Sequence, residues 1–144
     1  MASEKRCSKC TSDTASYSFK RVSDKQGVIT FYTNPAKAKI FKDHEDLLSH
    51  FEHMLALVTP AKQWVWIFDG DGFDTDHLLE VRLGMSIIQL ISEKHLSTLR
   101  EIKIINPSVH LKVILKIILR FINDDLGSKI NIKDDRPYSI LEFI

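Results

Sequence analysis

Cysteine, glycine and proline are all scarce in this sequence of 144 residues, which contains two, five and four of them. Both cysteines, Cys7 and Cys10, belong to one Cys-x-x-Cys motif in a polar stretch. A structural zinc site needs four ligands, and no second pair of cysteines completes one. A redox pair of the thioredoxin type would follow a strand and begin a helix, which is not the setting here. The few glycines and prolines give no sign of extensive disorder.

Long apolar runs and a strong net charge are also missing. No stretch of 18 apolar residues occurs, and the first ten residues lack the apolar core of a secretory signal. We therefore expect a cytoplasmic protein. The formal net charge of +1 is too low for a protein that coats nucleic acid with a strongly basic surface. We expect no nucleic-acid partner, and any phosphate contact must be local.

The common catalytic and metal motifs do not occur. There is no Gly-x-Ser-x-Gly elbow, glycine-rich phosphate loop or His-Glu-x-x-His sequence. Residues 69–76 resemble a calcium loop, but Phe73 and Asp74 stand where an oxygen ligand and a glycine are required, so a helix-capping turn is favoured. His50 and His53 are one helical turn apart without a third ligand, and we interpret them as solvent-exposed. We expect neither an enzyme nor a metal or cofactor.

The overall composition is that of an ordinary globular protein, with 44% hydrophobic and 27% charged residues. A chain of this length typically forms one domain with one core. Residues 1–16 are polar and rich in Ser, Thr and Lys, and are interpreted as a flexible tail. Residues 17–144 are expected to form the single domain.

Local patterns predict an α/β fold. Residues 17–22 and 28–33 are predicted to form a hairpin with a loop of about five residues. Apolar runs predict three further strands, and helical spacing predicts three helices; the strands are 63–69, 99–106 and 128–132, and the helices are 43–58, 75–94 and 107–122. This order implies a mostly parallel sheet with right-handed crossover helices and the hairpin at its edge.

The most apolar segment is Asn106–Ile122. From Val109 onward only four of its residues are not hydrophobic: His110, Lys112, Lys116 and Arg120. Spacing by four places the last three in one narrow basic row (Lys112, Lys116 and Arg120) on an otherwise apolar helix. The helix is too short and too charged to span a bilayer. Either it is a core helix with a solvated row, or it covers a lipid pocket or lies on a membrane surface, with its cations at phosphate groups.

Four motifs follow one another in a fixed order: Trp-Ile-Phe-Asp-Gly-Asp-Gly-Phe at 66–73, Leu-Arg-Glu-Ile-Lys-Ile-Ile-Asn-Pro at 99–107, Val-Ile-Leu-Lys-Ile-Ile-Leu-Arg-Phe-Ile at 113–122 and Gly-Ser-Lys-Ile at 127–130. Their combination resembles the CRAL-TRIO lipid-binding family, which includes the yeast-type phosphatidylinositol transfer proteins. The resemblance covers about residues 64–132. It implies a lipid pocket floored by the sheet, with helix 107–122 as a movable gate.

The resemblance also bears on the lipid headgroup. In the phosphoinositide binders of the family, a lysine that matches Lys129 contacts the inositol phosphate. The threonine that accompanies it is Leu126 here, and the Pro-Glu-Arg before the second strand is matched by Leu96-Ser97-Thr98. The glutamate of that headgroup site is therefore absent.

These observations lead to a first hypothesis, non-enzymatic binding and transfer of a phospholipid between membranes, with phosphatidylinositol or a phosphoinositide as candidates. Bound phospholipid would be the ligand, without a cofactor, and the protein would act in the cytoplasm, peripherally at membrane surfaces. The pocket is predicted to be lined by Met85, Ile88, Val113, Ile117 and Phe121. Headgroup or membrane contacts are predicted for Lys112, Lys116, Arg120 and Lys129.

A second hypothesis belongs to a different class. An apolar helix that no further segment covers can instead bind protein. The chain would then be a CRAL-TRIO-like interaction module without a ligand, which binds a small GTPase or forms a homodimer.

Overall fold

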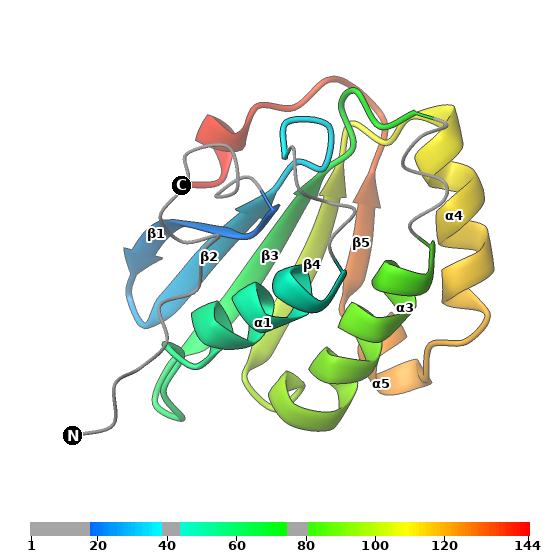
Figure 1. Cartoon of the computed structure of the whole chain (residues 1–144). Coiled ribbons are helices and arrows are strands. Elements are labelled where there is room, and N and C mark those ends of the chain that lie inside the picture. The colour runs from blue at the N-terminus through cyan, green and yellow to red at the C-terminus, as the bar shows by residue number, and fades with distance from the viewer. Residues whose placement is uncertain (1–17, 39–43, 75–80) are drawn as a thin grey trace.

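The computed structural model describes residues 18–38, 44–74 and 81–144, which form a five-stranded sheet under a layer of helices (Figure 1). The sheet order follows the chain: β1 (Lys20–Lys25), β2 (Val28–Thr33), β3 (Gln63–Asp69), β4 (Leu99–Ile105) and β5 (Ile130–Lys133). β1 and β2 pair antiparallel, whereas the other three pairings are parallel. The predicted α/β fold with a hairpin at the sheet edge is confirmed.

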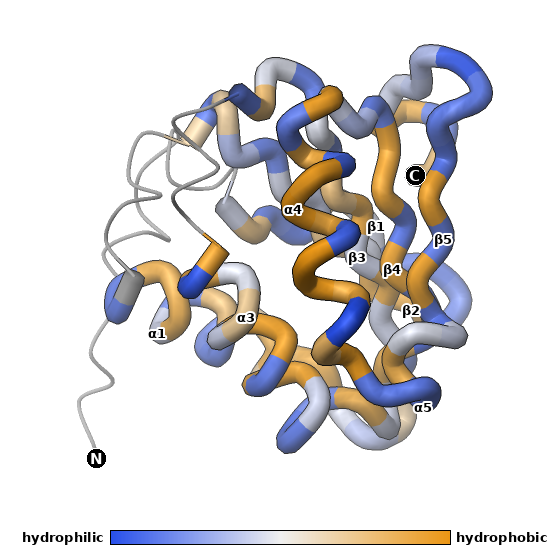
Figure 2. Tube along the Cα trace, turned by 90° about the vertical axis from the view of Figure 1, so that its right-hand side faces the viewer, coloured by the Kyte–Doolittle hydropathy of each residue, from blue (hydrophilic) through white to orange (hydrophobic). Residues whose placement is uncertain are grey.

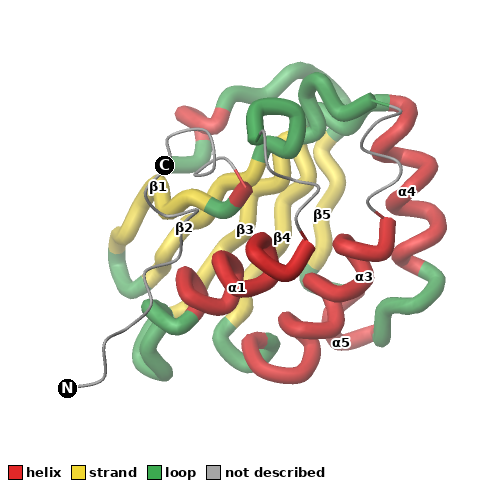
Figure 3. The backbone as a smooth tube through the Cα atoms, in the orientation of Figure 1, coloured by secondary structure: helices red, strands yellow, loops and turns green. Residues whose placement is uncertain are grey.

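The main helices lie on one face of this sheet (Figure 3). They are α1 (His44–Leu55), α3 (Val81–Leu90), which continues as a turn of π-helix η3 (Ile91–His95), and α4 (Val109–Leu119). Crossovers of one hand between neighbouring parallel strands place every connecting helix on the same face. None of the helices within the described ranges has both the length and the apolar character needed to cross a bilayer.

The hairpin turn differs from its prediction. The predicted five-residue loop is wrong, because β1 continues to Lys25, which pairs with Val28. Only Gln26 and Gly27 form the turn, with positive φ angles of 55° and 78°. A two-residue turn of this kind matches the right-handed twist of the strands it joins. Polar residues such as Asp24 are tolerated because β1 is an edge strand.

The other element boundaries shift by a few residues. α4 begins after Ser108, whose Oγ accepts a hydrogen bond from the backbone N of Leu111 at 3.1 Å, and it ends at Leu119 rather than at residue 122. A short helix, α5 (Asp124–Gly127), then delays the start of β5. The predicted helix 75–94 is seen from Val81 onward, and residues 75–80 lie outside the described residues.

Alternate residues of the strands pack on opposite faces of the sheet. The larger hydrophobic cluster lies under the helices and includes Phe31, Trp64 and Trp66. The smaller cluster, on the other face, includes Tyr32, Val65, Ile67 and Ile105. Residues near the C-terminus cover this second cluster: Tyr138, Ile140 and Phe143.

Candidate functional site: an apolar cavity under helix α4

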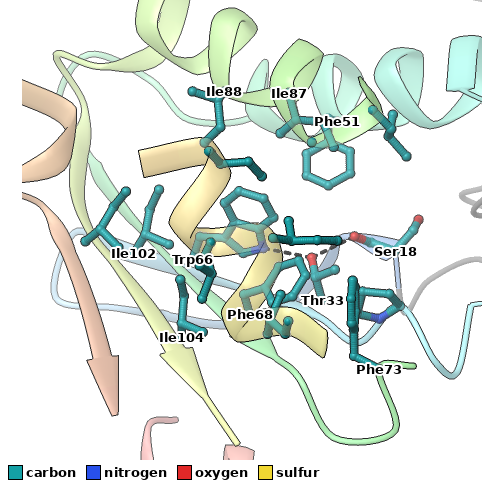
Figure 4. Close-up of a pocket in the computed structure, with 18 of the residues that line it drawn as sticks. Ser18, Thr33, Phe51, Trp66, Phe68, Phe73, Ile87, Ile88, Ile102 and Ile104 are labelled. Carbon is teal, nitrogen blue, oxygen red and sulfur yellow. Dashed lines mark hydrogen bonds between the residues drawn. The ribbon is translucent and has the colours of Figure 1, made fainter. Parts of the chain in front are cut away.

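A cavity of about 150 Å³ lies between the helices and the sheet. Strands β2 to β5 contribute residues to its floor, and α1, α3 and α4 contribute the opposite wall. In Figure 4, aromatic and aliphatic side chains from the strands lie opposite those from α1 and α3; the first group includes Trp66, Phe68, Ile102 and Ile104, and the second Phe51, Ile87 and Ile88.

Helix α4 contributes one face to this cavity. The lining residues repeat every three or four positions, which places them on one side of the helix; they are Leu111, Ile114, Leu115, Ile118 and Leu119, with Ile122 just beyond its end. Leu111, Ile114 and Ile118 are buried. The helix therefore separates the cavity from the surface of the molecule.

Polar groups in the described part of the wall are few, and they are paired with one another. Thr33 Oγ1 donates a hydrogen bond to the backbone O of Ser18 at 2.6 Å and accepts one from Trp66 Nε1 at 2.7 Å. Figure 4 shows these bonds at one side of the cavity. No charged side chain is among the described lining residues. Burial of an unpaired charge is costly, so this wall suits hydrocarbon.

The structure places most of the predicted pocket residues elsewhere. Ile88 is among the lining residues, but Val113, Ile117 and Phe121 are not, and they are 49%, 42% and 70% exposed on the outer side of α4. Met85 packs against the core cluster without being among the described lining residues. The structure therefore does not bring these four residues into the described wall of this cavity.

The physical reason is that α4 is apolar on two faces. Residues 113, 117 and 121 share one row, whereas Leu111, Ile114 and Ile118 share another, and hydrophobicity alone does not choose between them. The basic row supplies the missing signal. Cations stay in water, so the arc opposite Lys112 and Lys116 is the one that faces inward.

The basic row lies on the outer surface of α4. All three of its residues are exposed, and Lys112 Nζ is 3.5 Å from Asp134 Oδ2. Beside it runs an outer apolar row (Val109, Val113, Ile117 and Phe121). Figure 2, which views α4 from outside, shows hydrophilic and hydrophobic positions alternating along the helix. The exposed face of α4 therefore combines cations with large apolar side chains.

Lys129 is not part of this surface. Its Nζ donates hydrogen bonds to the backbone O of Leu96 at 3.1 Å and of Leu99 at 2.7 Å. It borders a separate polar hollow with residues such as Ser97 and Asp125. The structure thus does not bring Lys129 together with the basic row, and two of its three N–H groups bond to backbone carbonyls.

The histidines and the acidic stretch have structural contacts. His50 is 1% exposed and its Nε2 lies 2.8 Å from the backbone O of Phe19, so its predicted exposure is wrong, whereas His53 is exposed. Asp69 accepts a hydrogen bond from Tyr32 Oη at 2.6 Å and from the backbone N of Asp71 at 3.0 Å, as expected for a turn. Within the described ranges, no three His, Cys, Asp or Glu residues group as metal ligands.

Comparison with models of protein families gives a match over most of the chain. The model of the CRAL/TRIO domain matches residues 14–144, which are 131 of the 144 residues. No curated protein matches the chain. A CRAL/TRIO domain indicates binding or transfer of a lipophilic ligand in general, which agrees with an apolar cavity in an α/β fold. The chain belongs to the CRAL/TRIO domain family.

Proposed function

We propose that this protein binds a phospholipid through its acyl chains and transfers it between membranes without catalysis. The observation that carries the proposal is the apolar cavity under α4, whose described wall contains no charge. Each buried CH₂ group contributes about 0.8 kcal/mol, so even part of an acyl chain supplies substantial binding energy. The family match supports the coarser statement that the ligand is lipophilic.

The size of the cavity supports a role for α4 as a gate. A cavity of about 150 Å³ is comparable to an engineered cavity that holds a single benzene, whereas pockets for drug-sized ligands are several times larger. A complete acyl chain therefore enters only when α4 moves away from the sheet. Between Val109 and Leu119 the inward side chains of α4 are all apolar, so this movement breaks no buried polar contact of the helix face.

The outer face of α4 supports a peripheral membrane contact. Cations near an anionic surface contribute about 1 kcal/mol each, and exposed apolar side chains bury themselves at the headgroup boundary. The basic row and the outer apolar row offer both contributions on one helix. A membrane that binds this face would hold α4 at the bilayer while the cavity exchanges its contents.

The charge distribution determines how the lipid would lie. Because the described wall contains no cation, the phosphate would remain outside the cavity, close to the basic row, while the acyl chains enter. A row of three cations recognises phosphate rather than one particular headgroup. Phosphatidylinositol and phosphoinositides remain candidates through the family resemblance, and the site of action we propose is the cytoplasmic surface of membranes.

The test compares two substitutions on the same helix. Ile114→Phe adds a ring on the cavity side, whereas Ile117→Phe adds the same ring on the outer side. We expect Ile114→Phe to lower both the lipid that co-purifies, measured by extraction and mass spectrometry, and the rate of phospholipid transfer between vesicles. Ile117→Phe should preserve the co-purifying lipid and, because the outer face stays apolar, should not lower the transfer rate.

Two results would reject this function. The first is a wild-type protein that contains no lipid and transfers none, and the second is equal lipid loading in the two variants. A stable lipid-free dimer that Ile117→Asp dissociates would instead support the interaction module, because the outer apolar row would then be the protein interface.

A further inference from the structure

The polar contacts of Asn106 connect the start of α4 to the C-terminal segment (residues 134–144). Asn106 precedes Pro107 and has a positive φ of 50°. Its Nδ2 donates to the backbone O of Tyr138 at 2.8 Å, and its Oδ1 accepts from the backbone N of Tyr138 at 2.8 Å. The same Nδ2 donates to Asp69 Oδ1 at 3.1 Å. One side chain thus joins the ends of β3 and β4 to the C-terminal segment.

Two further features fix the same end of α4. A Cβ on Gly70 would lie 2.5 Å from Leu111 Cδ2 and 3.0 Å from Pro107 Cα, so the first turn of α4 packs directly on the backbone that follows β3. The ion pair between Lys112 and Asp134 adds a second link to the C-terminal segment. Because this pair is exposed, its contribution is small compared with that of the Asn106 contacts.

The C-terminal segment is itself anchored on the face of the sheet opposite the helices. Tyr138, Ile140 and Phe143 pack against the smaller hydrophobic cluster there. Lys103 Nζ lies 4.9 Å from the centre of the Phe143 ring, and Arg136 pairs with Glu142 at 2.7 Å. The position of this segment therefore depends on contacts that lie far from the cavity wall, on the other side of the sheet.

The other end of α4 has no comparable polar restraint from the residues that the structure describes. From Val113 to Ile122, no side chain forms a hydrogen bond or ion pair with any other residue that the structure describes. Apolar contacts over the cavity hold this part, and Phe121 at its end is 70% exposed. The contacts of α4 are thus unequal: they are polar and closely packed at the N-terminal end and apolar at the C-terminal end.

We infer that the C-terminal segment regulates the opening of α4, by holding its N-terminal end through Asn106 while the Phe121 end swings. Contacts that displace the segment from the back of the sheet would release this pivot and speed the exchange of bound lipid. The inference rests on the proposed function of α4 as a gate. It adds a second surface, on the opposite face of the sheet, from which the gate is controlled.

The experiment uses the full chain and three single variants. Asn106→Gly accepts the positive φ and removes the three side-chain hydrogen bonds. Phe143→Ala weakens the anchoring of the segment without touching α4. Leu141→Ala, at an exposed position of the same segment, is the matched control. Amide hydrogen exchange of α4 and of β3 is measured without lipid, and release of a pyrene-labelled phosphatidylcholine is measured separately.

We expect Asn106→Gly to raise α4 exchange and probe release roughly tenfold, as loss of one or two net hydrogen bonds would, while β3 stays protected. Phe143→Ala should act in the same direction, and Leu141→Ala should change neither. Equal increases in α4 and β3, or unchanged α4 exchange in both test variants, would overturn the inference. If wild-type protein binds no probe but the exchange results appear as expected, the proposed lipid function fails while the restraint on α4 stands.

Discussion

Gly84 of α3 lies directly against Ile118 of α4: a Cβ at position 84 would be 3.2 Å from Ile118 Cδ1. Both residues line the cavity, so this contact joins the fixed wall to the proposed gate. A side chain larger than hydrogen at position 84 must either displace the end of Ile118 or enter the cavity. Substitutions at position 84 therefore change the volume of the cavity under α4 directly.

Substitutions at Gly84 should separate helix stability from cavity volume. Gly84→Ala should leave the free energy of unfolding unchanged or raise it by up to about 1 kcal/mol, because alanine favours the helix and the Ile118 methyl can shift slightly. Gly84→Leu should cost about 1–3 kcal/mol through overpacking and should lower lipid occupancy. Urea denaturation and lipid extraction measure the two effects, with exposed Gln89→Leu on α3 as the control. Full lipid occupancy in Gly84→Leu would contradict the prediction.

The basic row should govern attachment to anionic vesicles. Lys116 and Arg120 are exposed and form no ion pair with a described residue, unlike Lys112. Reversal of both charges to Glu removes about 2 kcal/mol of attraction, so affinity for phosphatidylserine-containing vesicles should fall at least roughly thirtyfold. Vesicle sedimentation at several salt concentrations measures it. Arg82→Glu with Arg100→Glu reverses two exposed cations elsewhere, and an equal loss in that control would show that only overall charge matters.

Lys129 should be a structural residue. Its ammonium group donates to two carbonyls at the turn between η3 and β4, and hydrogen bonds to charged groups are among the stronger ones. Lys129→Met should lower the free energy of unfolding by about 1–3 kcal/mol, and Lys133→Met serves as the control. Binding of phosphoinositide-containing vesicles should change no more than in that control. A selective loss of phosphoinositide binding with normal stability would restore the headgroup role that the family resemblance implies.

His95 should make the fold less stable in mild acid. Burial lowers the pKa of this imidazole in the folded protein, while Glu52 opposes the shift and Lys94 adds to it. Its Nε2 is buried and has no hydrogen-bond partner among the described residues. Below the ordinary pKa of about 6.5 the unfolded chain binds a proton that the folded chain binds less readily. The free energy of unfolding should therefore decrease as the pH falls from about 6.5 toward the lower folded-state pKa. Denaturation at pH 7.5 and 5.5 measures this decrease, which His95→Gln should reduce. An equal decrease in His95→Gln would assign it to other groups.

The local patterns of the chain determined most of the fold. Continuous apolar runs identified β3 and β4 to within one residue, and helical spacing identified α1, α3 and α4 but not the short α5. The order of these elements required parallel neighbours. The hairpin turn was missed because Gln26 occupies a position where glycine or asparagine would have been the recognisable signal. Burial of His50 was missed because its acceptor, the carbonyl of Phe19, is distant in the sequence.

The sequence by itself determined that α4 is apolar around most of its circumference and carries one basic row. Hydrophobicity left open which apolar face covers the cavity, and the tertiary structure places Leu111, Ile114 and Ile118 inward and Ile117 and Phe121 outward. It also decided that Asn106 binds Tyr138, 32 positions away. Periodicity records how hydrophobic each face is, whereas the rotation of a helix and its long-range partners follow from the packing of the whole sheet and its neighbours.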